Sequence, residues 1–482
     1  MLETTLASHS QRKTRTLRGA HGLVWARAGG EVTPPVCRVA GLAWRSMGTR
    51  RGFGADYRKL YVATAVSNLG DGMAGIAYPW LASAVTRNPL LIALIGAAQR
   101  LPWLFFTLPA GVITDRVDRK RAMVTMDVVR GVVTVAVALG VLSQQGILPT
   151  PDALDEVVGT RTGLYLLVVA ATLLMGCAEV LRDNSGQTLM PSIVAEENLE
   201  KANGRMWSME SVANTFVGPP LGSLLLVVAF SLPFFLDAAS FFASAALVAL
   251  IPGTFRAAPD PSAASREPSS WRTDLREGVR WLWGHHLLRD MAIILGVMNM
   301  ASYVSGGIFV LFAQDVLGVS PLVFTIMGFG WAFGGILGGY AGPWMSQHFG
   351  PGPCLSLTLA AAAIAPLCVG LSSSWPLTMV FFAVFTLLGS SWNVITVSFR
   401  QSIIPAHLLG RVNSVYRFFA WGMMPIGAAL GGLTVTVAQR VTDRAMALRI
   451  AFFLEAAIMA VTFVLGRSRL TTARLEAARA AA

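Results

Sequence analysis

Long apolar segments alternate with short polar segments along most of the chain. Segments near the roughly 20 residues that cross a hydrocarbon core about 30 Å thick recur from residue 59 onward. We place twelve membrane-spanning helices at 59–84, 89–110, 122–143, 162–183, 206–230, 232–252, 288–313, 321–344, 352–371, 375–398, 412–437 and 446–466. The strands of a membrane barrel have only about 10 residues. Because lipid admits only helices or closed barrels, the pattern predicts an all-α integral membrane protein.

The longest polar break, 253–287, divides the chain into six-helix bundles at 58–252 and 288–466, with a tail at 467–482. The break begins Pro/Ser/Ala-rich and continues as WRTDLREGVRWLWGHHLLRD. Its second part has apolar and basic residues on separate helical faces, namely Trp271, Leu275, Val279 and Leu282 against Arg272, Arg276 and Arg280. We therefore expect a linker that carries an amphipathic helix on the membrane surface.

Composition supports a membrane protein, since 54% of the 482 residues are hydrophobic, 13% are charged and the mean hydropathy is +0.58. The net charge of +12 does not indicate a nucleic-acid partner, because the basic residues lie in short connections between apolar segments. Alternate connections, beginning with the N-terminal flank, hold most of these bases. The positive-inside rule then predicts a multi-pass protein of the cytoplasmic membrane with both termini in the cytoplasm.

Residues 1–57 form a basic extension without the apolar region of a secretory signal, and we expect it to be disordered. Met47 opens a compact basic flank, so we hypothesise that translation starts there. The four cysteines, Cys37, Cys177, Cys354 and Cys368, are widely spaced without a neighbouring His cluster. This spacing indicates neither a disulfide framework nor a metal site.

The two bundles contain a weak internal repeat. In the first, the loop LMPSIVAEENLEKANG leads into VGPPLGSLL; in the second, SIIPAHLLGRVNS leads into MPIGAALGG. The same order of a Pro-containing loop and a Gly-rich helix predicts two bundles related as a parallel repeat.

The stretch AGVITDRVDRKRAM, residues 110–123, concentrates charge between apolar flanks. It resembles the motif G-x-L-a-D-r-x-G-r-k of the major facilitator superfamily of secondary transporters. The matching residues are Gly111, Asp115, Arg116, Arg119 and Lys120, while Ile113 replaces Leu and Asp118 replaces the second Gly. That last change is typical of a drug- and siderophore-exporting branch, which includes enterobactin exporters and macrolide efflux proteins.

A second resemblance lies in the predicted helix 206–230, where Gly218, Pro219 and Gly222 match the core of the superfamily's antiporter motif, G-P-x-x-G. Asn214 stands at an upstream position that often holds Gly. The resemblance implies alternating access by two bundles, with proton antiport. It also implies that Asp115, set against a helix N-terminus with Arg116 and Arg119 as partners, is a conformational latch.

Ionisable residues deep in apolar segments are costly and are usually paired or functional. Asp71 and Arg100 come to similar depth on neighbouring predicted helices, so we expect them to pair. This pair is either structural or a proton-coupling site. Asp237 and Glu455 stand alone in their segments and are candidates for a second protonation site.

Five charged residues lie within about two turns of the predicted cytoplasmic helix ends. We expect Asp127, Arg130, Glu179, Arg182 and Glu210 to form a network that holds a cytoplasmic gate. The expected substrate cavity is aromatic with sparse polar groups, lined by Asn68, Tyr78, Trp80, Gln99, Trp103, Asn299, Tyr303, Trp392 and Asn393. Such a lining suits amphipathic organic molecules.

The sequence thus predicts a secondary active exporter of a drug, a siderophore or a hydrophobic metabolite. Uptake, facilitated diffusion and a non-transporting sensor remain alternatives. An enzyme is not indicated, because the chain has no G-x-x-x-x-G-K-[ST], H-E-x-x-H or G-x-S-x-G motif. The expected partners are a small-molecule substrate, protons and membrane lipid, without nucleic acid, and the protein is expected to be a monomer. No cofactor is expected, since the proton gradient supplies the energy.

Overall fold

The structure is a computed structural model that describes residues 53–151, 153–256 and 271–480. Gly52–Ala482 forms one compact unit. The expected extension lies almost wholly outside the described residues, as do Cys37 and Met47.

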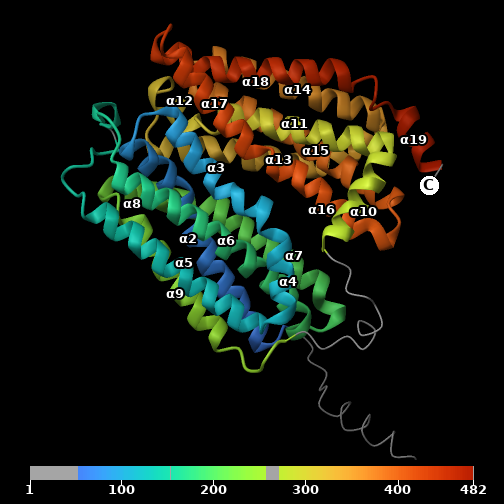
Figure 1. Cartoon of the computed structure of the whole chain (residues 1–482), viewed down its shortest axis with the longest axis horizontal. Helices are drawn as coiled ribbons and strands as arrows, with labels where there is room; N and C mark the ends of the chain where they lie inside the picture. Colours follow the sequence, from blue (N-terminus) through green and yellow to red (C-terminus); the bar gives the residue numbers. More distant parts are fainter. Residues whose placement is uncertain (1–52, 152, 257–270, 481–482) are drawn as a thin grey trace, which may run out of the picture. The chain divides into compact units, whose positions relative to one another are not determined.

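The N-terminal bundle contains the first six predicted spans, each of which is helical (Figure 1). Two of them are interrupted: α3 continues as α4, and α7 continues through a π-helical turn, η3, into α8. The helices are α2 (Ala55–Val85), α3 (Pro89–Phe105), α4 (Thr107–Arg116), α5 (Arg119–Leu142), α6 (Thr162–Ile193), α7 (Leu199–Ser211), η3 (Val212–Val217), α8 (Gly218–Val228) and α9 (Leu232–Ala249).

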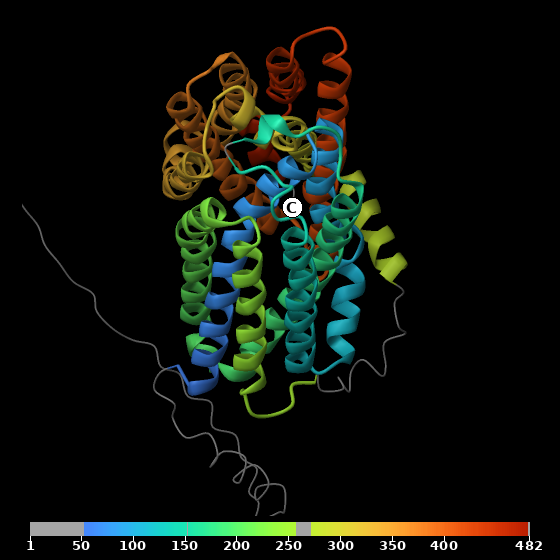
Figure 2. The same cartoon turned by 90° about the vertical axis from the view of Figure 1, so that its left-hand side faces the viewer.

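The C-terminal bundle follows the linker helix α10 (Trp271–Gly284) and ends before the short α19 (Thr472–Ala480). Its helices are α11 (His286–Gly306), α12 (Phe309–Asp315), α13 (Pro321–Phe349), α14 (Pro351–Leu371), α15 (Trp375–Ile403), α16 (Ala406–Gly422), α17 (Met424–Ala438) and α18 (Arg444–Gly466). In the view of Figure 2, the long helices of the N-terminal bundle run side by side.

Ten helical segments of the described chain are long and apolar enough to cross a membrane. The remaining two predicted spans are α2, which carries several charges, and α3, a shorter apolar helix continued by α4. The all-α class is confirmed, and the expected twelve spans are consistent with these helices.

Local sequence explains several helix starts. Asn88, Asp118 and Asp443 each accept a hydrogen bond from a backbone N–H in the first turn of the following helix. These side chains satisfy donors that have no partner within the helix.

Glycines explain how equivalent helices pack in the two bundles. A Cβ at Gly222 of α8 would lie 2.6 Å from the backbone oxygen of Met73 in α2. A Cβ at Gly427 of α17 would lie 2.0 Å from the backbone oxygen of Met300 in α11. Both Gly-rich helices therefore approach the first helix of their own bundle at backbone distance. This agreement supports the parallel repeat.

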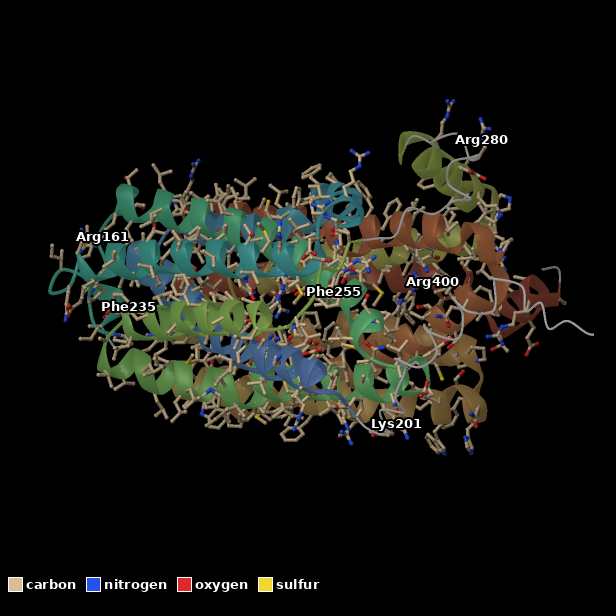
Figure 3. The ribbon with its side chains drawn as sticks, turned by 90° about the horizontal axis from the view of Figure 1, so that it is seen from below. Arg161, Lys201, Phe235, Phe255, Arg280 and Arg400 are labelled. Atoms are coloured by element: carbon tan, nitrogen blue, oxygen red, sulfur yellow. The ribbon has the colours of Figure 1, made fainter. Side chains whose placement is uncertain are left out.

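The bundles contact each other around α3 and α17, and around α8 and α13. Trp80 of α2 packs edge-on against Phe324 of α13, with ring centroids 5.0 Å apart. Ser223 of α8 forms a 2.6 Å hydrogen bond with Thr325 of α13. We call the end of the bundles that carries the α2–α3 and α17–α18 connections the clasp end. Figure 3 shows Arg161 and Phe235 near this end, and Lys201 and Arg400 further toward the opposite end.

The linker helix α10 packs against α16 and α11 of the C-terminal bundle. Leu282 is fully buried, while Arg276 and Arg280 are exposed, as the amphipathic pattern predicts. Arg280 points away from the bundle in Figure 3. The side chains of 271–275 lie outside the described part.

Candidate functional site

A cavity of about 370 Å³ lies among α2, α3, α5, α6 and η3 of the N-terminal bundle. Its lining holds six charged side chains, which are Asp71, Arg100, Arg130, Glu179, Arg182 and Asp183. A second cavity, of about 530 Å³, shares Asn68, Arg182 and Asp183 with the first. The second cavity extends toward the end opposite the clasp, to Leu60 and Asn203.

Asp71 forms the shortest ion pair of this lining. Arg130 Nη2 donates a 2.6 Å hydrogen bond to Asp71 Oδ1. The Arg130 side chain is 3% exposed, whereas that of Asp71 is 29% exposed and faces the cavity. The expected Asp71–Arg100 pair is therefore wrong. Helical depth placed both residues correctly, but α5 packs so that Arg130 reaches Asp71.

Asp127 lies behind this pair, fully buried. Its Oδ1 lies 3.8 Å from Arg130 Nη1 and 3.5 Å from Arg182 Nε, and its Oδ2 accepts a 2.7 Å hydrogen bond from Ser244. Arg182 also donates to Thr64 Oγ1 at 3.2 Å. These contacts join α2, α5, α6 and α9 of one bundle, so the network does not hold a gate between the bundles in this conformation.

The other two residues of the expected gate lie at the cavities. Glu179 lines the first cavity and Glu210 lines the second. Neither carboxylate has a hydrogen bond or ion pair within the described residues.

Arg100 lines the first cavity from α3. Its guanidinium is 5.6 Å from the ring centroid of Trp421 in α16, and the Trp103 ring stacks on Trp421 at 6.0 Å. Within the described part of the chain, Arg100 forms no ion pair. Arg100 and Trp103 of the cavity lining thus both contact Trp421 of the C-terminal bundle.

The two isolated acids differ in their surroundings. Glu455 accepts a 2.5 Å hydrogen bond from Ser305 of α11, which is the polar partner that the sequence did not reveal. Asp237 is fully buried, and neither carboxylate oxygen has a hydrogen-bond partner among the described residues. A Cβ at Gly70 of α2 would lie 2.4 Å from Asp237 Oδ1, so α9 packs closely against α2 at this glycine.

Four of the expected cavity residues line the first cavity, which are Asn68, Tyr78, Gln99 and Trp103. Trp80 and Trp392 do not line it, because they are 0% and 2% exposed within packed interior. Tyr303 packs against the apolar core, and the partly exposed Asn299 and exposed Asn393 lie in α11 and α15. The cavity also holds far more charge than expected. Glu179 and Asp183 are four residues apart on α6, a spacing that places both on one helix face.

The charged motif between α4 and α5 makes its contacts within the N-terminal bundle. Asp118 accepts hydrogen bonds from the backbone N–H groups of Arg121, at 2.9 Å, and Phe255, at 2.7 Å. Arg119 donates to the Thr188 carbonyl and Lys120 to the Ile251 carbonyl, each at 3.0 Å.

The contacts of the remaining motif residues do not test the expected latch, which stays a prediction. Arg116 is exposed, and a Cβ at Gly111 would meet open space. Asp115 belongs to α4, but its side chain lies outside the described part, as do most side chains at the start of α16.

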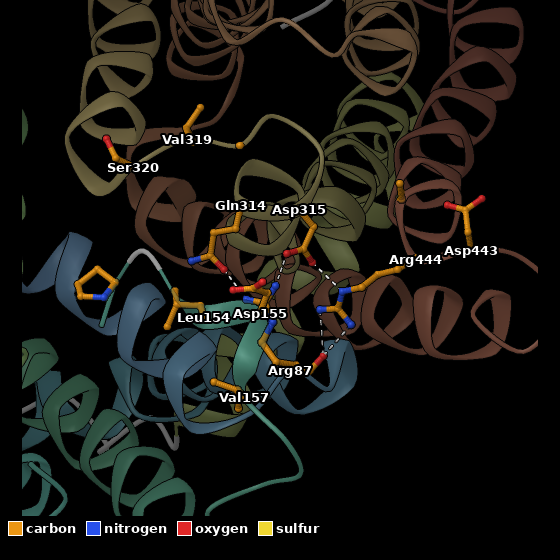
Figure 4. A pocket seen from close by; sticks show the side chains of 13 residues that line it. Arg87, Leu154, Asp155, Val157, Gln314, Asp315, Val319, Ser320, Asp443 and Arg444 are labelled. Carbon is orange, nitrogen blue, oxygen red and sulfur yellow. Dashed lines mark hydrogen bonds and ion pairs between the residues drawn. The ribbon is translucent and has the colours of Figure 1, made fainter. Parts of the chain in front are cut away.

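A polar cluster that the sequence did not reveal joins the bundles at the clasp end (Figure 4). Arg87, directly after α2, pairs with Asp315 of α12 and donates a 2.6 Å hydrogen bond to Gln314. Arg444 Nε donates to Asp315 Oδ2 at 2.7 Å, and its Nη atoms lie 3.3 Å from the Arg87 carbonyl oxygen. Burial lowers the pKa of Arg87, and Asp315 opposes that shift. We call Arg87, Gln314, Asp315 and Arg444 the clasp.

The hydrogen bonds between the bundles are concentrated at one end of the molecule. Within the described residues, every side-chain hydrogen bond between the bundles lies at the clasp end, at the clasp itself or at Ser223. The hydrogen bonds thus join the two bundles at the clasp end. The second cavity extends toward the opposite end.

Two bundles of helices, most of them long and apolar enough to cross a membrane, define a multi-pass membrane protein. The sequence profile of the Major Facilitator Superfamily matches residues 60–428, and the chain belongs to this family, which makes it a transporter rather than an enzyme.

Curated relatives are similar along most of the chain. The multidrug efflux pump Tap of Mycobacterium tuberculosis is 25% identical over 395 residues, which cover 80% of this chain and 89% of that protein. The enterobactin exporter EntS of Escherichia coli is 24% identical over 386 residues, which cover 78% of this chain and 85% of that protein.

Solved structures share the fold. A point mutant of the nucleoside transporter NupG aligns with a TM-score of 0.63 at 12% identity, over 86% of this chain and all of that one. A bacterial homologue of the iron transporter ferroportin, in an inward-facing state, gives a TM-score of 0.63 at 13% identity, over 86% of this chain and 98% of that one.

Proposed function

We propose that the protein exports small organic molecules across the cytoplasmic membrane by alternating access, driven by proton antiport. The names of the relatives support export, since they are efflux pumps and exporters. The distribution of basic residues supports cytoplasmic termini, which makes the clasp end the outer face. The structure then corresponds to the state that is closed to the outside.

The observation that carries proton coupling is the Asp71–Arg130 pair. Asp71 reaches the cavity, whereas Arg130 is buried and has Asp127 as a second carboxylate at 3.8 Å. A proton that enters the cavity and binds Asp71 neutralises one partner of Arg130. Arg130 then interacts more strongly with Asp127, so protonation changes the contacts among α2, α5 and α6. A ligand can shift such an equilibrium by its differential affinity for the two states.

The test is flux in proteoliposomes with an imposed pH gradient and a fluorescent drug. Asp71→Asn is expected to abolish gradient-driven flux while drug binding persists. The matched control is Asp56→Asn, the same substitution in the same helix, at a residue whose partner is Lys59 at the surface. Gradient-driven flux that persists in Asp71→Asn would refute the coupling role. Flux that runs in the same direction as the protons would indicate uptake instead of export.

A further inference from the structure

Two opposite charges of the first cavity form no ion pair within 4.0 Å among the described residues. Of the six charged side chains in the lining, Asp71 is paired with Arg130, and Asp183 lies 3.6 Å from Arg182. Arg130 and Arg182 also face the buried Asp127. Glu179 and Arg100 remain, and neither forms an ion pair within the described residues.

These two groups lie on neighbouring helices of the lining. Glu179 lies on α6 of the N-terminal bundle, beside the Asp71–Arg130 pair. Arg100 lies on α3 beside the stacked indoles of Trp103 and Trp421, where α3 meets α16. The cavity therefore presents a carboxylate, a guanidinium and a flat aromatic surface to its contents.

From this arrangement we infer that the cavity binds a zwitterionic aromatic molecule. Its cationic group pairs with Glu179, its anionic group pairs with Arg100, and its rings stack on Trp103. An unpaired charge in a partly buried cavity is costly, and a ligand that pairs with both charges removes both costs. An amphipathic molecule without charged groups would form neither of these two pairs.

The cavities accommodate an organic molecule of several fused or linked rings. The first holds about 370 Å³ and shares the lining residues Asn68, Arg182 and Asp183 with the second, of about 530 Å³. Glu210 adds a carboxylate to the second cavity, so the cationic group meets an acid on its way in. That this molecule is transported rests on the proposed function. That the cavity binds it does not.

Three xanthene dyes test the two charges separately. Rhodamine B carries a cation and a carboxylate, rhodamine 6G carries the cation with its carboxyl group esterified, and fluorescein is anionic. Fluorescence polarisation with the purified full chain in detergent measures binding without a proton gradient. The wild type is expected to bind rhodamine B about tenfold more tightly than either other dye, since rhodamine B alone forms both charge-assisted pairs.

The variants give a crossed pattern. Glu179→Gln is expected to lose about tenfold in affinity for rhodamine B and rhodamine 6G and to keep fluorescein binding. Arg100→Gln is expected to lose about tenfold for rhodamine B and fluorescein and to keep rhodamine 6G binding. Each variant is expected to keep binding one dye, and this retained binding shows that the variant is folded. Glu200→Gln and Arg58→Gln, at exposed positions outside the lining, are the matched controls and should bind all three dyes as the wild type does.

Equal losses for all three dyes in either variant, or no loss, would overturn the inference, as would a wild type without preference for rhodamine B. A crossed binding pattern without gradient-driven flux would instead sustain the inference and refute the proposed exporter.

Discussion

The clasp offers a direct test of alternating access. Asp315 receives hydrogen bonds from Arg87 and Arg444, and the side chains of these three residues are 16%, 11% and 36% exposed. Hydrogen bonds to charged groups contribute about 1.5–3 kcal/mol each, and partial exposure places these near the lower limit. Asparagine keeps one acceptor, so Asp315→Asn should destabilise the clasped state by about 2 kcal/mol. At 1.4 kcal/mol per tenfold, the equilibrium shifts about 30-fold toward separated bundles.

Spin labels at Val158 and Val441 can measure this shift, since the residues are 96% and 83% exposed and lie in connections of different bundles at the clasp end. The four native cysteines are replaced by alanine beforehand. A separated form populated at about 1% would rise to about a quarter, seen as a longer distance in double electron–electron resonance.

The matched control for the clasp is Asp443→Asn, which removes the same charge from a neighbouring carboxylate. Asp443 caps α18 through the N–H of Met446 at 2.9 Å and forms no hydrogen bond between the bundles in the described structure. If Asp315→Asn and Asp443→Asn gave the same distance distribution, the clasp would not stabilise the closed outer face.

Two further predictions concern stability, measured as thermal unfolding of the protein in detergent. Gly222→Ala should destabilise the protein by about 1–3 kcal/mol, because its Cβ would lie 2.6 Å from the Met73 carbonyl oxygen. The control Gly111→Ala should be neutral or stabilising, because its Cβ meets open space. Equal effects of the two substitutions would refute backbone contact between α8 and α2. Asp118→Ala should cost about 1–3 kcal/mol at neutral pH, through lost bonds to Arg121 and Phe255. Burial opposes ionisation of Asp118, but these amides and nearby Arg121 and Lys120 outweigh it and hold its pKa below the ordinary 3.8. This stabilisation is therefore present above about pH 4 and is lost as the pH falls through the lowered pKa. The difference in stability between wild type and Asp118→Ala should then disappear in acid. A difference that is constant with pH would contradict the role of the charge.

Much of the fold could be predicted from hydrophobic pattern. The positions of the spans, the break before α10 and the repeat of the Gly-rich helices follow from segment length and composition, because lipid leaves the backbone few alternatives to a helix. Helix interruptions were missed: α3 gives way to α4 after Phe105, and η3 lies between α7 and α8. The hydrophobic pattern continues through each break and does not mark it. The signal for the second break is Pro219 and Pro220, which directly follow η3 and Gly218 and remove two backbone donors.

The sequence by itself determined which ionisable residues lie at membrane depth, since that depends only on distance along a helix. Only the tertiary structure decided their partners. Asp71 meets Arg130 instead of Arg100, and Glu455 meets Ser305, because helix rotation and neighbour order bring together residues far apart in sequence. The clasp depends on tertiary structure in the same way. In the sequence, Arg87, Asp315 and Arg444 lie in or beside short polar connections and show no sign of a shared site. Only the packing of the two bundles brings them into contact.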